Sequence, residues 1–426
     1  MKLRAVRGMN DILPDEIRGW HRVERAFQRV AVRYGYEEVR TPLIENTALF
    51  ERQIGETTDV VEKEMYSFQR HDDRLTVRPE GTAGAARAYV EHGTYAKEPI
   101  SRWYYLGPMF RGERPAKGRY RQFYQLGCEL FGDPGPVCDA EMIELQVRVL
   151  AELGIKDVAV YINSLGSGDT RARYKDALLA HFSPRKDALS EDSQRRLEKN
   201  PLRILDSKDP KDHAAAEGAP TLLDVLSEED RAHFAAVQKA LDALSIPYTV
   251  DTKLVRGLDY YTRTLWEIKA TSADLGAQST LSGGGRYDNM VEELGGPKTP
   301  AIGFAMGIER LLVAMGEIEA KRLRPQVFVA VFADSGLAPA LGLASALRGR
   351  DAKVEVDARD SKLKAKLRRA EQSGARLCVL AGGSEIERGV FAVKDLAAHA
   401  QDEIPIEGAA NVLFDRLQSF AGEGAS

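Results

Sequence analysis

The sequence predicts an α+β fold in two domains, with a helical insertion inside the first. Up to Pro325, alternating strand patterns such as Val158, Val160 and Ile162 are mixed with amphipathic helices. Residues 166–245 change to a charged, alanine-rich composition that favours helices. After Pro325, strands and helices alternate for about a hundred residues, which is typical of a small α/β domain. We therefore place the domains at residues 1–325 and 326–426.

Composition and charge describe an ordinary globular protein. The chain of 426 residues is 43% hydrophobic and 29% charged, and its net charge is -4, so a polyanion site must be a local patch. Cys128, Cys138 and Cys378 lack paired CxxC spacing, which argues against a disulfide framework and a structural zinc site. The N-terminus lacks the apolar core of a signal peptide, and the apolar segment 301–315 is interrupted by charges and too short to span a bilayer. We expect a cytoplasmic protein with no membrane segment.

The N-terminal part of the chain predicts short elements punctuated by glycine and proline. Apolar residues recur from Trp20 to Tyr34 at three- and four-residue spacing, which predicts an amphipathic helix that Gly35 ends. Pro42 stops the strand that follows, because proline belongs at a strand end or edge. The next expected elements are a short helix at 49–55, a polar loop at 56–64, and paired strands at 65–68 and 75–78.

A tight turn, Arg78-Pro-Glu-Gly-Thr82, precedes a helix expected over residues 83–91. Thr82 is a candidate N-cap of this helix. Glu80 is placed either to receive an ammonium group, with help from the Thr82 hydroxyl, or only to complete the local capping. The turn alone leaves both interpretations open.

The stretch from Leu106 to Phe131 predicts two strands around a basic loop. Between Arg111 and Arg121 the loop has five basic residues and only Glu113 against them. Arginine grips phosphate oxygens in pairs, so the loop suits an anionic ligand. Gln125 and Glu129 are four residues apart on the second strand and therefore share a face. The stretch indicates a site for a phosphorylated substrate and a small polar one; the alternative is a solvated basic hairpin.

Three later features carry glycine or arginine in apolar surroundings. Arg256 is flanked by apolar residues, so it either pairs with Asp259 or reaches an anionic ligand. Residues 283–288, Gly-Gly-Gly-Arg-Tyr-Asp, are expected to form a flexible turn that lets backbone approach a ligand. Residues 301–310 are expected to be a small-residue strand that enters a helix, with Arg310 either on a phosphate or a flat ligand, or paired with an acid inside the fold.

The C-terminal domain contains a basic helix at residues 362–371. On it, Leu363, Leu367 and Ala370 are expected to face the sheet, and Lys362, Lys364, Lys366, Arg368 and Arg369 the other faces. A basic helix on a separate domain suggests a nucleic-acid contact, although a solvated face would show the same pattern.

Taken together, these stretches resemble the class II aminoacyl-tRNA synthetases and, within that class, the histidyl-tRNA synthetases of the bacterial type. The strand with Pro42 resembles the first class II motif, which builds the dimer. The second and third motifs resemble residues 110–114, Phe-Arg-x-Glu-Arg, and 303–310, Gly-x-x-x-Gly-x-Glu-Arg. More specific are Leu254-Val-Arg-Gly-Leu-Asp-Tyr-Tyr261, residues 121–129 and residues 78–82. The resemblance implies an antiparallel sheet flanked by helices, the helical insertion and a C-terminal anticodon-binding domain.

The resemblance also implies a ligase that joins histidine to tRNA(His), with ATP and Mg²⁺, as a homodimer. Around ATP, Arg111 and Arg256 would bind the α-phosphate from two sides, Arg310 the far phosphates and Glu113 the adenine side. Around histidine, Glu80 and Thr82 would hold the ammonium, Gln125 the α-amino and carboxylate end, and Glu129 and Tyr261 the imidazole, with Tyr260 and Tyr287 lining the pocket. The resemblance assigns no residue of the protein as a metal ligand.

Two rival functions remain at the level of sequence. One is a catalytically inactive histidine-binding paralogue that regulates an ATP phosphoribosyltransferase. Such a paralogue is expected to lack both the Arg256 stretch and the C-terminal domain, which this chain has. The other is a related synthetase for a different amino acid, since the type of C-terminal domain is shared.

Overall fold

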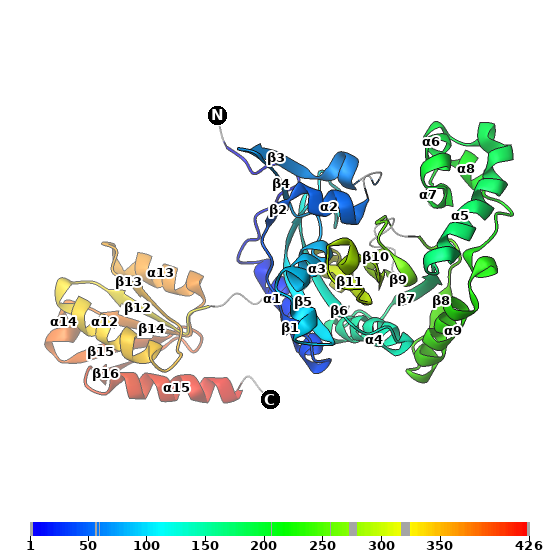
Figure 1. Ribbon diagram of the computed structural model, residues 1–426. Coiled ribbons are helices and arrows are strands. Elements are labelled where there is room, and N and C mark those ends of the chain that lie inside the picture. The colour runs from blue at the N-terminus through cyan, green and yellow to red at the C-terminus, as the bar shows by residue number, and fades with distance from the viewer. Residues whose placement is uncertain are drawn as a thin grey trace. The chain divides into compact units, whose positions relative to one another are not determined.

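The structure, a computed structural model, describes residues 3–55, 58, 60–205, 207–255, 257–271, 279–316 and 324–423. The chain divides into two compact units, Met1–Ala320 and Lys321–Ser426. Arg256 lies outside the described residues. Each unit is described below by itself, and Figure 1 labels the elements of both.

A central sheet, with eight strands among the described residues, organises the first unit. Its strand order is β1 (Glu37–Glu38), β5 (Ser101–Phe110), β6 (Gln122–Phe131), β11 (Ala301–Gly307), β10 (Thr280–Arg286), β9 (Thr262–Ala270), β7 (Val158–Ser164) and β8 (Tyr248–Val250). All neighbours from β5 to β7 pair antiparallel, and the two edge pairs, β1–β5 and β7–β8, are parallel. The sheet is therefore antiparallel through its centre, as the resemblance implies.

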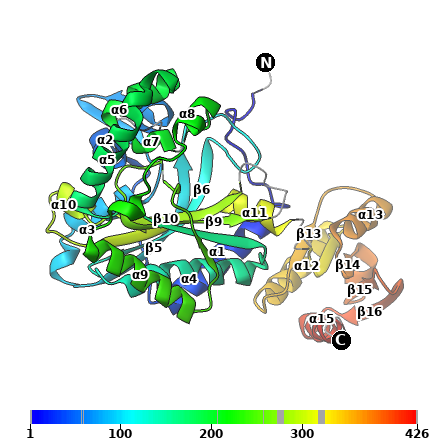
Figure 2. The same ribbon diagram turned by 90° about the vertical axis from the view of Figure 1, so that its right-hand side faces the viewer.

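The two faces of this sheet differ in chemistry. Helices α1 (Ile17–Arg33), α4 (Pro136–Leu153) and α9 (Glu228–Ala243) cover one face, as Figure 2 shows. Leu126, Cys128 and Leu130 of β6 point into the core beneath these helices. Because side chains alternate along a strand, Gln125 and Glu129 face the opposite side. That opposite side holds the candidate site.

Helix α1 forms where the apolar spacing predicts it. Trp20, Val23, Phe27 and Val30 are buried and join the main core, while the other side of the helix is exposed. The helix ends at Arg33, and Gly35 follows with a positive φ of 78°, a conformation that glycine adopts without strain.

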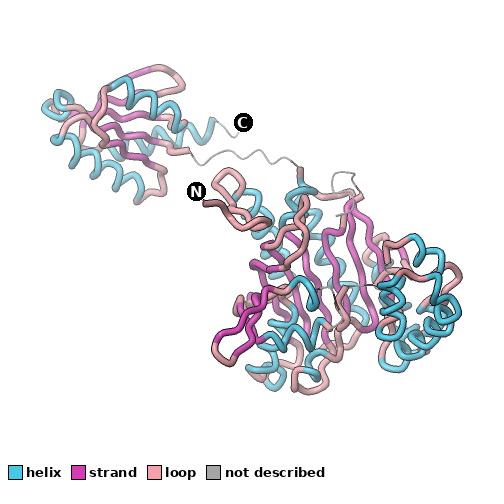
Figure 3. Tube along the Cα trace, turned by 90° about the horizontal axis from the view of Figure 1, so that it is seen from above, coloured by secondary structure: helices cyan, strands magenta, loops and turns pink. Residues whose placement is uncertain are grey.

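The segment between β7 and β8 is helical, as its composition predicts. It contains α5 (Gly168–Phe182), α6 (Glu191–Lys199), α7 (Leu202–Leu205), α8 (Pro210–Ala215) and α9. Helices α5 to α8 share a separate core with Leu178, Phe182 and Leu197, and they gather at one edge of the sheet in Figure 3. Helix α9 instead packs on α4 through Phe234 and Val237, which belong to the main core.

The first unit also contains a second, smaller sheet. It consists of β2 (Ile44–Asn46), β4 (Asp73–Val77) and β3 (Tyr66–Arg70), all antiparallel. Helices α2 (Thr47–Ile54) and α3 (Thr82–Glu91) pack on one another next to it, and α10 (Met290–Glu293) contacts α3. Helix α11 (Ile308–Met315) follows β11 directly.

The second unit is a small α/β domain. Its sheet has the order β13 (Val354–Asp357), β12 (Val327–Val331), β14 (Leu377–Ala381), β15 (Val390–Asp395) and β16 (Ala400–Pro405), and the first three strands are parallel. Its helices are α12 (Asp334–Arg348), α13 (Leu363–Ser373), α14 (Gly383–Glu387) and α15 (Ala409–Glu423). None of the helices within the described ranges of the whole chain combines the length and apolarity that crossing a bilayer requires.

The basic helix α13 is less solvated than its sequence predicts. Lys366 is buried, and its ammonium donates hydrogen bonds to the carbonyls of Val331 and Asp357 at two strand ends. Its aliphatic stem lies along the apolar side of the helix, while Leu363, the first residue of the helix, is exposed. The expected faces of Lys366 and Leu363 were therefore wrong. Arg369 also pairs with Asp357, at 2.6 Å, so the exposed cations of the segment are Lys362, Lys364 and Arg368.

All three cysteines are buried with free thiols. Cys128 and Cys138 lie in the core of the first unit, and Cys378 lies in β14 of the second. Burial raises the pKa of each thiol, to about 12 for Cys378. The thiols are therefore protonated and inaccessible in the folded protein.

Candidate active site

A cavity of about 270 Å³ lies on the face of the central sheet opposite α1, α4 and α9. Its lining comes from segments that are far apart in the sequence: α3, the β5–β6 hairpin, the segment after residue 256, β10, β11 and α11. Of the residues singled out from the sequence, the cavity is lined by Glu80, Thr82, Arg111, Glu113, Gln125, Tyr260, Tyr261, Tyr287 and Arg310. The fold thus brings nine separately identified residues to one hollow.

Glu129 lies beneath this cavity and is the acceptor in a buried network of hydroxyl groups. Its Oε1 accepts hydrogen bonds from Thr82 Oγ1 at 2.7 Å and from the Tyr105 hydroxyl at 3.0 Å. Its Oε2 accepts from the Tyr287 hydroxyl. Burial raises the pKa of Glu129 to about 8, although the three hydroxyl donors favour the ionised form and pull it down.

Glycines make room for this network. The Glu129 carboxylate occupies the space that a Cβ on Gly303 of the neighbouring strand would need. The Tyr105 ring likewise occupies the space above Gly81 and Gly127. Any side chain at these three glycines would collide with Glu129 or Tyr105. The network can therefore form only because these positions are glycine.

Tyr105 was not singled out from the sequence. Its position in β5, directly opposite Gly127 in β6, places its hydroxyl next to Glu129 across the strands. The signal that could have found it is the cross-strand register of the hairpin, in which an aromatic residue faces a glycine.

Glu80 caps helix α3, and the expected N-cap was wrong. The N-cap residue is Gly81, and Thr82 is the first residue of the helix. The Glu80 carboxylate accepts hydrogen bonds from the backbone N–H groups of Thr82 at 2.7 Å and Ala83 at 2.8 Å. Burial raises the pKa of Glu80. Local capping is thus present, and the same carboxylate also lines the cavity.

Two arginines from opposite parts of the first unit line the same cavity. Arg111 Nε donates to the Pro79 carbonyl at 2.8 Å, and its guanidinium lies 5.4 Å from the centre of the Phe123 ring. Arg310 Nη1 donates to the Thr280 carbonyl at 2.8 Å. Each guanidinium is thus held by a hydrogen bond to a backbone carbonyl. Two segments that are far apart in the sequence each bring a positive charge to the cavity.

The remaining predicted residues divide between the described and undescribed parts of the chain. Glu113 pairs with Arg119 across the basic loop. Tyr260 and Tyr261 stack at an angle, with ring centres 4.7 Å apart. Arg256 lies outside the described residues. The structure therefore does not test whether Arg256 pairs with Asp259.

Residues 283–286 form the end of strand β10 rather than the expected flexible turn, and residues 287–288 follow the strand. Gly283, Gly284 and Gly285 are buried inside β10 and pair with β9 and β11 on both sides. A Cβ on Gly284 would meet the Gly303 carbonyl and the Trp266 ring, so the triplet permits close strand packing. The reason for the wrong prediction is that glycine marks close approach as often as it marks flexibility.

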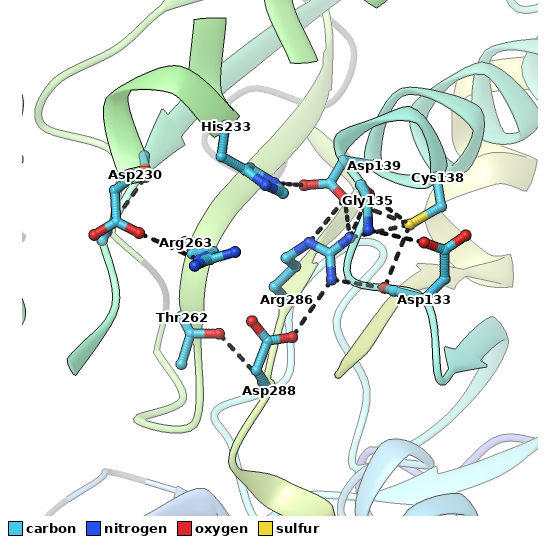
Figure 4. A network of polar contacts seen from close by, with 12 residues as sticks. Asp133, Gly135, Cys138, Asp139, Asp230, His233, Thr262, Arg263, Arg286 and Asp288 are labelled. Carbon is cyan, nitrogen blue, oxygen red and sulfur yellow. Dashed lines mark hydrogen bonds and ion pairs between the residues drawn. The ribbon is translucent and has the colours of Figure 1, made fainter. Parts of the chain in front are cut away.

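A buried ionic network surrounds Arg286 at the end of β10 (Figure 4). Arg286 is fully buried, and its Nε donates to Asp139 Oδ1 at 2.8 Å. His233 Nε2 lies 2.9 Å from the other oxygen of Asp139. The Arg286 Nη groups also donate to the carbonyls of Asp133, at 3.0 Å, and Gly135, at 2.6 Å. No sequence pattern marked this network, which anchors the strand end just before Tyr287.

The buried carboxyl groups predict how the stability of the ligand-free protein depends on pH. Burial raises the pKa of Glu129 to about 8 and that of Glu309 to about 7, above the ordinary value of about 4.3. The folded state therefore holds protons that the unfolded state releases, and stability falls as pH rises from about 4.5 to 8. We expect the thermal unfolding midpoint to fall between pH 6 and 8.5. The fall should be shallower in Glu129→Gln and unchanged in Glu217→Gln, where the replaced side chain is exposed; equal slopes in all three proteins would contradict the assignment.

Comparison with known proteins matches both units. Residues 8–311 match the family model described as histidyl-tRNA synthetase, and residues 326–416 match the anticodon binding domain. A curated histidine–tRNA ligase from Sorangium cellulosum (strain So ce56) is 66% identical over 416 residues, covering 98% of this chain and 97% of that protein. One from Anaeromyxobacter dehalogenans (strain 2CP-1 / ATCC BAA-258) is 47% identical over 409 residues, covering 95% of this chain and 97% of that protein.

A solved structure agrees with these relatives. The crystal structure of apo S. aureus histidyl-tRNA synthetase superimposes with a TM-score of 0.80 at 34% identity, covering 96% of this chain and 99% of that one. The fold is that of a class II aminoacyl-tRNA synthetase with a C-terminal anticodon-binding domain. The chain belongs to the histidyl-tRNA synthetase family.

Proposed function

We propose that this protein is a histidine–tRNA ligase, which activates L-histidine with ATP and transfers it to the 3′ end of tRNA(His). The observation that carries the proposal is the composition of the cavity. The guanidinium groups of Arg111 and Arg310 line it. The buried carboxyl group of Glu129 lies behind the lining and is hydrogen-bonded to Thr82 and Tyr287, which belong to it. A site of this kind suits a substrate with phosphates at one end and a ring with N–H groups at the other.

The first step is attack of the histidine carboxylate on the α-phosphorus of ATP, which gives histidyl-adenylate and pyrophosphate. The carboxylate is already a nucleophile, so no general base is required. Negative charge grows on the phosphate oxygens in the transition state, and fixed guanidinium groups stabilise it without reorganising. We assign Arg111 and Arg256 to the α-phosphate, Arg310 to the far phosphates and Glu113 to the adenine side. In the second step, a ribose hydroxyl of the tRNA attacks the acyl carbon and AMP leaves.

Gln125 gives separate support for where the α-amino group of histidine binds. Its Oε1 is buried and has no hydrogen-bond partner among the described residues, and the side chain lines the cavity. A buried acceptor without a partner is costly, and an ammonium donor from the ligand would satisfy it. We therefore assign Gln125, with Glu80 and Thr82, to the α-amino end of histidine.

The imidazole end is assigned to Glu129 and the tyrosines. Imidazole offers N–H donors, and the Glu129 carboxylate retains a lone pair on Oε2 beyond the one that the Tyr287 hydroxyl uses. Tyr261 is assigned to the second ring nitrogen, and Tyr260 and Tyr287 to the pocket walls. A pocket of hydrogen-bonding groups rejects a side chain that cannot pair with them by roughly 10⁴-fold or more.

Mg²⁺ fits this site as an ion that arrives with ATP. Among the described residues, no group of three or more His, Cys, Asp or Glu side chains could hold a metal alone. Mg²⁺ bound to nucleotides takes most of its oxygens from phosphates and water and needs only one or two carboxylates. Glu309, which lines the cavity, would supply one. When bound, it neutralises charge on the phosphates.

The wider assignment follows from family membership. We propose that residues 1–325 are the catalytic domain and residues 326–426 the domain that contacts the tRNA anticodon. The expected strand up to Pro42 is only β1 in the structure, and Pro42 lies in the connection between β1 and β2. We also propose a homodimer built through this segment, acting in the cytoplasm.

Exchange of pyrophosphate into ATP tests the proposed function. We expect exchange when histidine is added. Each of the other amino acids, tested in its place, should give little exchange. No exchange with any amino acid, together with measurable histidine binding, would favour the regulatory paralogue. A better substrate than histidine would identify a synthetase of another specificity.

Ending the chain at Pro325 is expected to separate the two steps. Each unit has its own hydrophobic core, so the first should remain folded. Histidine-dependent pyrophosphate exchange should persist within a few fold, while charging of tRNA(His) should fall by about tenfold or more, since contacts to the tRNA are lost. Undiminished charging would mean that the second unit does not contribute to tRNA binding.

A further inference from the structure

The helical insertion packs directly against the segment that carries two tyrosines of the cavity. Leu202 and Ile204 of α7 belong to the same buried cluster as Leu254 and Tyr261, and Tyr260 packs against that cluster. The wall of the cavity and the core of the insertion are thus continuous.

Polar side chains of the insertion extend this contact to the backbone of the same segment. Arg203 Nη2 donates to the Gly257 carbonyl at 2.9 Å and lies 3.3 Å from Asp259 Oδ1. Asn200 Nδ2 donates to the same Asp259 oxygen at 3.3 Å. The side chains of Arg203 and Asp259 are 16% and 25% exposed, so these charges are largely withdrawn from solvent. We call Asn200, Arg203 and Asp259 the latch.

A third segment, the end of α2, also contacts Asp259 of the latch. The backbone N–H of Asp259 donates to the Ile54 carbonyl at the end of α2, at 3.1 Å. Gly55 follows with a φ of 99°, and a Cβ there would lie 2.6 Å from Asp259 Oδ2. Asp259 is therefore held between the insertion and α2, one residue before Tyr260.

We propose that Asn200 and Arg203 are positioning residues for histidine activation: through Asp259 they fix the placement of Tyr260 and Tyr261. The insertion then contributes to the amino-acid site in the absence of tRNA. This inference rests on the proposed function and adds a role for insertion residues that lie outside the cavity. The physical reason is that Tyr260 and Tyr261 have short backbone connections to Asp259, so a shift of Asp259 moves both rings.

A role confined to stability is separable from this one. Arg203 lies at the border of the insertion core, which is built from apolar side chains that its replacement leaves in place. Arg195, one turn of α6 before Lys199, offers a matched control because it is 77% exposed and its ion pair among the described residues is local, with Asp192.

The test is pyrophosphate exchange without tRNA, with the Michaelis constants for histidine and ATP and the thermal midpoint measured for each protein. For Arg203→Ala we expect the KM for histidine to rise about tenfold, the scale of losing a hydrogen bond to a charged group. The KM for ATP should stay within about twofold and the midpoint close to that of wild type. Arg203→Lys should restore part of the loss, because an ammonium reaches one of the two acceptors. Arg195→Ala should match wild type.

Each outcome decides the proposal. An unchanged KM for histidine in folded Arg203→Ala, equal rises for histidine and ATP, or an equal effect in Arg195→Ala would overturn it. Should Arg203→Ala fail to fold, Asn200→Ala takes its place, because it removes only one amide contact. The same comparison, of the KM for histidine with the KM for ATP, then decides. Wild-type protein without histidine-dependent exchange would refute the proposed function instead. The latch would then be judged by calorimetric histidine binding to the same variants.

Discussion

Replacing Arg111 with alanine is expected to lower the rate of histidine-dependent pyrophosphate exchange by about 10²- to 10³-fold. The guanidinium lines the cavity and is held by the Pro79 carbonyl and the Phe123 ring, so it reaches the site already oriented. A preorganised cation of this kind acts on charge that develops only in the transition state. The loss should therefore appear mainly in the maximal rate, and the KM for histidine should change little.

Two companions sharpen this experiment. Lys117→Ala removes an exposed cation from the same loop and should leave exchange near the wild-type rate. Arg111→Lys keeps the charge but loses the planar fork, and it should recover only part of the rate. If Lys117→Ala were as impaired as Arg111→Ala, the loop would act through its total charge rather than through one positioned group.

Glu129→Gln is expected to have the second largest effect, a fall of about 10²-fold or more in kcat/KM for histidine. The amide keeps the size of the side chain, but its NH₂ group faces hydroxyl donors and cannot accept from all of them. The ring nitrogens of histidine would then compete for too few acceptors. The KM for ATP should change little, because the phosphate end of the cavity is formed by other residues.

Tyr105→Phe provides the graded comparison. It keeps the ring above Gly127 and removes a single hydrogen bond to Glu129, so we expect a loss of roughly tenfold or less. Wild-type discrimination among amino acids by Glu129→Gln would show that Glu129 supports the pocket without reading the ligand.

The alternation of β6 is the part of the site that the sequence predicts best. A period of two is a strong physical constraint, so spacing alone puts Gln125 and Glu129 on one face and Leu126 on the other. The same logic failed for Lys366, because a long stem lets an ammonium reach strand-end carbonyls from an apolar position. Pattern reasoning treats charge as a surface property and misses such cases.

Contacts between distant segments could not be predicted from spacing. The Asp139–Arg286 ion pair joins residues 147 positions apart, and no local signal marks either partner. The insertion is a similar case, since its charged residues resemble a solvated surface until the fold brings Arg203 to Asp259. Local patterns report burial and turns, whereas these pairs depend on how the chain closes on itself.

The buried cysteines give this protein an internal reporter of unfolding. Neither unit presents a thiolate to solvent, so alkylating reagents should react only with molecules that have opened. Cys128 and Cys138 report on the first unit and Cys378 on the second. Pulse labelling followed by mass spectrometry of the modified peptides would therefore assign an opening free energy to each unit in one sample, without a tag or an introduced probe.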